Sequence, residues 1–375
     1  MNKQYLQDTD NNKKRQILFN EELQEAVLLQ ADASKSAGEP IRTLDELKEA
    51  LQQAIELEHT TIPAYLSALY SIKDGTNPES IKNIRGVAVE EMLHMVLAAN
   101  LLNAIGGAPV INKPGFIPKY PYKMELSDEP FEVNLDYFSP DSISVFMHIE
   151  KPQPTNKPPA PGVYHSIGQF YTAIYRAMHR LDKHTPGGIF VGDHSKQITS
   201  EHYYGSGGKL IGVYDMKSAH IAILEIIGQG EGVDGSIIDS DSVLFGEDVE
   251  LAHYFRFSEI YYERHYREDD NSSQPPTGKP LPVNWSAVQK FKKNMKMNDY
   301  EQGSALWRAA LDFNITYNQL LNNIHIACNG NPAHISKGIG LMYDLKYKAV
   351  ALMNMPMGDG WYAAPTFEYV PLDQI

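Results

Sequence analysis

The sequence predicts a mainly α-helical protein built on a four-helix bundle. Long stretches repeat apolar residues every three or four positions, which indicates amphipathic or buried helices. Several of these apolar faces also carry glutamate and histidine, which is typical of bundles that bind metal in their core. A proline-dense stretch separates the second bundle helix from the third. We therefore expect extra C-terminal helices and an irregular insertion with short strands between bundle helices two and three.

The composition excludes several classes of protein. The chain has 375 residues, of which 42% are hydrophobic and 21% charged, as in ordinary globular proteins. Its formal net charge of -14 disfavours nucleic acid and anionic membranes as partners, since both bind basic surfaces. We find no apolar run of transmembrane length and no signal-peptide pattern, so we expect a cytoplasmic protein. Cys328, the single cysteine, excludes an internal disulfide and a thiolate metal site.

The chain divides into three parts. Residues 1–40 are polar and form an N-terminal arm, residues 41–270 form the metal-binding bundle with an insertion at 108–215, and residues 271–375 supply C-terminal helices. In the insertion we expect strands at Phe131–Leu135 and Ile143–Ile149 and a helix that opens at Ser166. The C-terminal helices are expected at about Tyr300–Ile326 and Ile335–Met353, packed on the outside of the bundle.

The first bundle helix presents Glu58 to the core. Thr43 and Glu46 form a capping box, so the helix starts there. Glu58 falls on the apolar stripe, whereas Glu56 falls on a more polar face. Pro63 is able to bend the helix and shift that face. We assign Glu58 as the inward carboxylate.

The second bundle helix carries Glu91 and His94 one turn apart on its apolar face. A buried carboxylate without a partner costs several kcal/mol, so such groups are paired or bound to metal. Glu-x-x-His alone is a weak motif, because a core histidine satisfied by its neighbour gives the same pattern. The presence or absence of matching glutamates and histidines on the other helices distinguishes these interpretations.

The third and fourth bundle helices supply the remaining candidates. The third, Ser218 to about Gln229, offers Glu231 if a bulge in its glycine-rich end turns that side chain inward, and Glu225 if the helix stays regular. The fourth, Glu247 to about Arg267, carries a second Glu-x-x-His, Glu250 and His253.

Together these helices predict a dinuclear carboxylate site. The order Glu, Glu-x-x-His, Glu, Glu-x-x-His along four helices is the ligand pattern of carboxylate-bridged di-iron and di-manganese bundles. Oxygen and imidazole ligands favour two iron ions, and manganese or zinc also fit. The predicted ligands are Glu58, Glu91, His94, Glu231, Glu250 and His253.

Five segments of the sequence are informative together: Thr61-Ile-Pro-Ala-Tyr-Leu after Glu58, Glu90-Glu-Met-Leu-His94, Gln229-Gly-Glu-Gly232, His253-Tyr-Phe-Arg-Phe257 and Pro365-Thr-Phe-Glu-Tyr369. They resemble a bacterial ferritin-like family that includes the iminophenyl-pyruvate dimer synthases of violacein-type and chromopyrrolate-type pathways. The resemblance implies a ferritin-like bundle with a metal site and a role in secondary metabolism. It favours Glu231 over Glu225, because the family's glutamate lies in the Gln-Gly-Glu-Gly segment, and it supports His253. Glu250 rests on spacing alone.

The leading functional hypothesis is a non-haem dinuclear oxidoreductase. Two metal ions about 3.5–4 Å apart would activate dioxygen at a small organic substrate such as an amino acid or imine. The second hypothesis is a ferritin-like iron-binding or scaffold protein without turnover, and the third is a metal-free bundle whose glutamates and histidines form a polar network. No residue is assigned as catalytic or as an axial haem ligand, and a homo-oligomer is left open.

Overall fold

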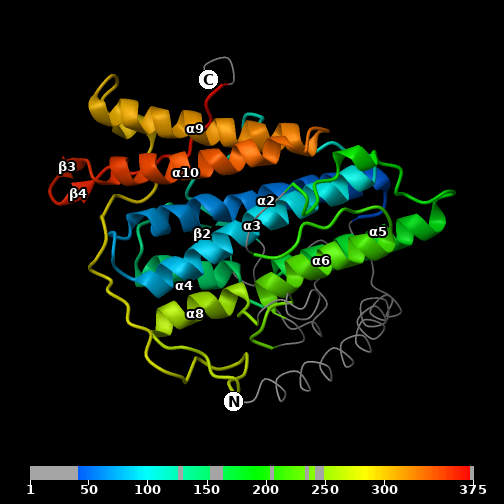
Figure 1. Ribbon diagram of the computed structural model, residues 1–375, viewed down its shortest axis with the longest axis horizontal. Coiled ribbons are helices and arrows are strands. Elements are labelled where there is room, and N and C mark those ends of the chain that lie inside the picture. The colour runs from blue at the N-terminus through cyan, green and yellow to red at the C-terminus, as the bar shows by residue number, and fades with distance from the viewer. Residues whose placement is uncertain are drawn as a thin grey trace.

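Two long helices, α2 (Leu44–Ser71) and α3 (Pro78–Ala104), form the middle layer of the computed structural model (Figure 1). The structure describes residues 41–125, 130–152, 164–202, 207–232, 236–240 and 249–371. The predicted capping box starts α2, with the Thr43 hydroxyl accepting from the Glu46 amide and the Glu46 carboxylate accepting from the Thr43 amide. The helix continues through Pro63, and the two helices pack as the antiparallel hairpin that the sequence predicts.

Four shorter helices cover one face of this pair. They are α4 (Pro140–Ile149), α5 (Ile167–His184), α6 (Met216–Glu231) and α8 (His253–Tyr262). Figure 1 shows α4 and α8 beside one half of α2 and α3, and α5 and α6 beside the other half. Helices α4 and α5 both contact α2, whereas α6 and α8 both contact α3. The second half of the bundle is therefore made of two interrupted helices.

The predicted strand at Ile143–Ile149 is wrong, because these residues lie in α4. The Ser139 hydroxyl accepts a hydrogen bond from the Ser142 amide, and Pro140 occupies the first helical position, where its missing N–H costs nothing. The strand predicted at Phe131–Leu135 is present in part as β2 (Phe131–Val133), which pairs antiparallel with β1 (Tyr122–Met124).

The fourth predicted bundle helix is shorter than expected. Residues 241–248, which include its predicted start, lie outside the described residues, and residues 249–252 are not helical. Helix α8 begins at His253 and ends at Tyr262, where Glu263 adopts the left-handed conformation that terminates helices. The predicted N-terminal arm, residues 1–40, also lies outside the described residues.

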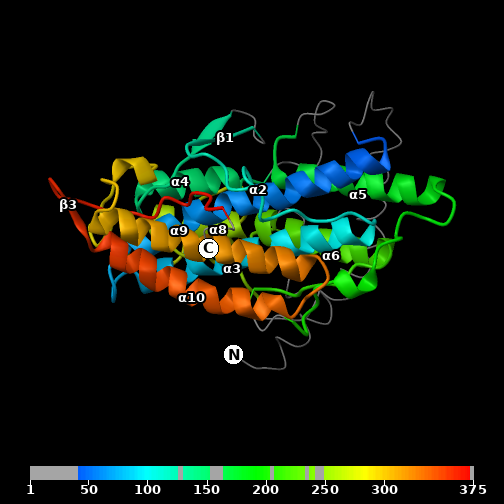
Figure 2. The same ribbon diagram turned by 90° about the horizontal axis from the view of Figure 1, so that it is seen from above.

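The C-terminal helices α9 (Ala305–Cys328) and α10 (His334–Met353) form a hairpin on the other face of α2 and α3, close to the predicted ranges. Figure 2 shows this pair from above, in front of the bundle. Short elements complete the described structure: the 3₁₀ turns η1 (His194–Lys196) and η2 (Met297–Asp299), and the strands β3 (Pro356–Gly358) and β4 (Trp361–Tyr362).

Helix α3 corrects one expectation from composition. By length and mean hydropathy it is long and apolar enough to span a membrane, although we had found no such run. In the fold, 89% of that apolar stretch is buried inside the protein. Its hydrophobicity is explained by its place in the middle layer, between the C-terminal hairpin and the interrupted helices.

Candidate metal centre

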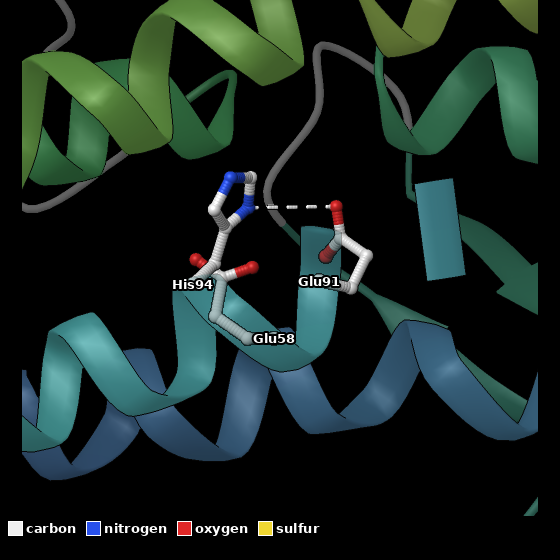
Figure 3. A group of neighbouring side chains, drawn as sticks. All are labelled: Glu58, Glu91 and His94. Atoms are coloured by element: carbon white, nitrogen blue, oxygen red, sulfur yellow. Dashed lines mark ion pairs between the residues drawn. The ribbon is translucent and has the colours of Figure 1, made fainter. Parts of the chain in front are cut away.

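Buried carboxylates and imidazoles from four helices converge in the middle of the bundle. They form two groups of three: Glu58, Glu91 and His94 in the first, and Glu91, Glu150 and His253 in the second. Within each group, one ligand atom per residue lies within 4.8 Å of the others. Glu91 belongs to both groups. Figure 3 shows the first group, with Glu58 reaching from α2 toward the two side chains of α3.

The second group forms where the interrupted helices break. Glu150 is the C-terminal cap of α4, and His253 is the first residue of α8. Helix α5 begins and helix α6 ends at the same level, since Gly168 and Glu231 line a small cavity of about 10 Å³ together with Glu58 and Glu91. The two interruptions therefore bring helix ends, rather than helix faces, to the centre.

Glu91 lies between the two imidazoles. Its Oε1 atom is 2.9 Å from His253 Nδ1 and 3.6 Å from His94 Nδ1. The rings are stacked with their centroids 5.5 Å apart. The short approach to His253 is not aligned for a hydrogen bond, so the buried Nδ1 of His253 has no hydrogen-bond partner among the described residues. A buried nitrogen directed at carboxylates in this way fits a metal ligand.

The outer nitrogens of both imidazoles are held by acceptors. His253 Nε2 lies 2.7 Å from Glu90 Oε2, and His94 Nε2 lies 2.7 Å from Gln229 Oε1. The Gln229 amide is oriented by Glu225, which accepts from its Nε2 at 3.2 Å. In its neutral form, each imidazole would donate from Nε2 and present the Nδ1 lone pair to a bound ion, which is the arrangement in which histidine binds metal.

Hydroxyl groups orient the three carboxylates. Tyr171 donates to Glu58 Oε1 at 2.6 Å, Thr61 donates to Glu91 Oε2 at 3.1 Å, and Tyr65 donates to Glu150 Oε1. Each carboxylate uses one oxygen in such a bond. The second oxygen of each is left for the centre, which again fits carboxylates that ligate a cation.

The sequence pattern of the Ferritin-like family matches residues 51–262, which include all five residues of the two groups. This match spans more than half of the chain. The chain belongs to the Ferritin-like family. A crystal structure of a ferritin like protein from Caulobacter vibrioides is similar in fold, with a TM-score of 0.59 and 23% identity over 87% of this chain and 99% of that one. No protein of curated function matches the chain.

This Ferritin-like chain holds Glu231 at the edge of the centre. Glu231 ends α6, and its Oε1 accepts a hydrogen bond of 2.9 Å from the Gly168 amide at the start of α5. A Cβ atom on Gly168 would lie 2.6 Å from that oxygen, so any larger residue there would displace the Glu231 carboxylate from its present position. Glu225 faces away from the cavity and accepts from the Lys209 amide at 3.1 Å. The preference for Glu231 agrees with its position, and metal binding by Glu231 stays a prediction.

Glu250 is the predicted ligand that the structure does not bring to the centre. It precedes α8 rather than lying one turn before His253 in a helix, so the expected Glu-x-x-His geometry is absent. Its side chain is 50% exposed and forms an ion pair of 3.2 Å with Arg256. The second group obtains its carboxylate from Glu150 instead.

Sequence reasoning missed Glu150 and Glu90. Glu150 was missed because a strand was predicted for Ile143–Ile149. Ser139 followed by Pro140 is nevertheless typical of a helix start, and α4 begins there. Glu90 stands beside Glu91 in the motif, and its role depends on Arg256 and His253, far away in sequence. Glu90 Oε1 is 2.8 Å from an Arg256 nitrogen. Burial alone would raise the pKa of Glu90, but the Arg256 guanidinium lowers it to about 2.

The electrostatics of this Ferritin-like centre favour a cation. Burial, reinforced by the Glu91 charge, raises the pKa of Glu58 well above its ordinary value and raises the pKa of Glu150. Burial opposes ionisation of Glu91 too, but the His253 and His94 imidazoles hold its pKa well below the ordinary range. Three buried carboxylates repel one another, and divalent ions would relieve that repulsion. The donor set therefore fits a metal centre.

Proposed function

We propose that this protein is a non-haem dinuclear oxidoreductase, with iron as its metal, that acts with dioxygen on a small organic substrate such as an amino acid or imine. The observation that carries the proposal is the place of Glu91 in both ligand groups. A carboxylate common to two sets of ligands would bring two metal ions close together, and inward glutamates and histidines from facing helices are the ligands of di-iron and di-manganese carboxylate bundles.

The residues divide into two sets around that shared carboxylate. Glu58 and His94 would hold one ion, and Glu150 and His253 would hold the other. Glu231 lies beside the first set and is available as a further ligand. Bound iron would supply the redox chemistry toward dioxygen that amino-acid side chains lack. Oxygen and imidazole donors without thiolate support iron, and they also accept manganese or zinc.

The wall of the small cavity supports an enzyme over a storage protein. Ile149, Ile167, Ile226 and Ile227 line it beside the carboxylates. An apolar wall excludes water from the reacting groups, which storage does not require. In the same proposal, the activity resembles that of the iminophenyl-pyruvate dimer synthases, and the protein works in the cytoplasm. The competing function is a ferritin-like iron-binding or scaffold protein that turns over no substrate.

The deciding experiment is metal analysis of the purified, iron-loaded protein and of two isosteric variants. We expect about two irons per chain in the wild type and in Glu250→Gln, and loss of both in Glu91→Gln. Oxygen consumption with a panel of amino acids then separates the two functions. Two irons without oxygen consumption for any substrate would favour the iron-binding protein. Equal iron in wild type and Glu91→Gln would refute the dinuclear centre.

A further inference from the structure

The two histidines of the metal centre differ in the side chain that stands behind each of them. His253 Nε2 lies 2.7 Å from Glu90 Oε2, and His94 Nε2 lies 2.7 Å from Gln229 Oε1. The two imidazoles are also alike in burial, with His253 0% and His94 2% exposed. Distance and burial are therefore matched, whereas the partner is a carboxylate in one case and an amide in the other.

The Gln229 amide separates His94 from a buried carboxylate. Its Nε2 group donates to Glu225 Oε1 at 3.2 Å and to the Gly207 carbonyl at 3.4 Å. A carbonyl oxygen only accepts hydrogen bonds, so these contacts place the amide oxygen toward His94. Glu225 is 0% exposed and lies one helical turn before Gln229 on α6. Its carboxylate is therefore separated from His94 by a neutral side chain.

Arg256 does not cancel the negative charge behind His253. Its guanidinium donates to Glu90 Oε1 at 2.8 Å. The same guanidinium also forms ion pairs of 3.2 Å with Asp239 and with Glu250. One positive charge is shared among three carboxylates, so the group behind His253 keeps a net negative charge.

We propose that the protein gives its two metal positions histidines of different strength as ligands: Glu90 makes His253 the stronger one, and the Gln229 amide leaves His94 the weaker one. A carboxylate that accepts from the outer N–H of a metal-binding imidazole raises the basicity of that imidazole. A neutral amide accepts a weaker hydrogen bond and has a smaller effect. The inference rests on the proposed dinuclear centre. It makes Glu90, Gln229 and Glu225 positioning residues that act on the ions through the histidines.

Two variants of the full chain isolate the two metal positions. Glu150→Gln leaves the position of Glu58 and His94 intact, and Glu58→Gln leaves the position of Glu150 and His253 intact. Glu91 is present in both variants. Competition of the metal-free proteins against a coloured chelator, with Co²⁺ as the probe, then measures the affinity of one position without an ion in the other.

The decisive variant exchanges the two side chains behind His94. Glu225→Gln combined with Gln229→Glu keeps the net charge and moves the carboxylate into contact with the imidazole. In the Glu150→Gln protein we expect this exchange to tighten Co²⁺ binding about tenfold. In the Glu58→Gln protein it should change the affinity less than twofold. A gain of affinity at one position cannot come from damaged folding.

Glu90→Gln is the reverse change at the other position. In the Glu58→Gln protein it should weaken Co²⁺ binding at least tenfold, and in the Glu150→Gln protein several-fold less. The proposal is overturned if the folded exchange variant shows no gain of affinity, or if Glu90→Gln weakens both positions equally. Wild-type protein that binds fewer than two Co²⁺ per chain would refute the dinuclear centre and this inference with it. Two bound Co²⁺ without a response to the exchange would refute this inference alone.

Discussion

Glu90 Oε2 lies 2.7 Å from His253 Nε2, although the two residues are 163 positions apart in the chain. A carboxylate that directly precedes Glu91, the residue common to both groups, thus orients a histidine from another helix. Arg256, three residues after His253, binds the other oxygen of Glu90. Glu90 of α3 therefore contacts both His253 and Arg256 of α8. These buried contacts join the two helices at the centre.

Glu90→Gln should weaken metal binding without removing a ligand. The amide cannot carry the charge that supports His253 and Arg256, so we expect metal affinity to fall about 10–100-fold. Competition against a coloured chelator measures the change. Glu49→Gln, at an exposed position of α2, serves as the control. Unchanged affinity in Glu90→Gln would mean that this carboxylate only packs against Arg256.

Glu150→Gln should halve the metal content. Glu150 belongs only to the second ligand group, whereas Glu58 and His94 in the first group remain intact. We expect about one iron per chain by elemental analysis, against about two for the wild type and for Glu250→Gln. Retention of two irons would show that Glu231 or a residue outside the described ranges replaces Glu150.

His59 should make stability depend on pH in the mildly acidic range. Burial lowers the pKa of His59 to about 3, whereas an unfolded histidine titrates near about 6.5. Below that pH the unfolded chain binds a proton that the folded protein does not, so the free energy of unfolding falls with falling pH. Between pH 6 and pH 5 the His59 contribution approaches about 1.4 kcal/mol per unit.

Urea denaturation of the metal-free protein at both pH values measures this slope. His59→Phe lacks the titrating group, so its free energy of unfolding should fall less steeply than that of the wild type. The comparison cancels the carboxylates, which both proteins share. Parallel slopes would show that His59 is protonated in the folded state at mildly acidic pH.

Cys328 should be unreactive in the folded protein. It is completely buried at the end of α9, and burial raises the pKa of its thiol to about 12. The thiolate is the reactive form, so a disulfide reagent at pH 8 should label no thiol in native protein and one per chain in denaturant. Rapid labelling of the native protein would contradict the packing of α9 on the bundle.

Patterns of residues close together in the sequence predicted the long helices well. They predicted the residues of the two groups at the centre less completely. The Thr43 capping box and the apolar stripe placed Glu58 inward, where it is 1% exposed, and placed Glu56 on the outer face, where it pairs with Lys113. These features depend on residues close in sequence. The inward position of Glu58 is confirmed, and its binding of metal stays a prediction.

The errors arose where tertiary structure decides the local conformation. Glu250 was chosen because a regular helix would carry it one turn before His253, but the chain is not helical there. Glu150 was passed over because β-branched and aromatic residues favour strands in isolation, whereas here they pack α4 against α2 and α8. Interruptions of a helix that are stabilised by contacts on other helices leave little trace in the sequence.

The two interruptions also affect how the protein unfolds locally. Helices α4 and α8 have 10 residues each, and helices of this length are marginal on their own. Metal ions at the centre would cross-link the ends of α4 and α8 to α3. We therefore expect amide hydrogen exchange in these two helices to slow together when metal binds, while exchange in α9 and α10 stays unchanged. The metal would then act as a structural link as well as a reactive group.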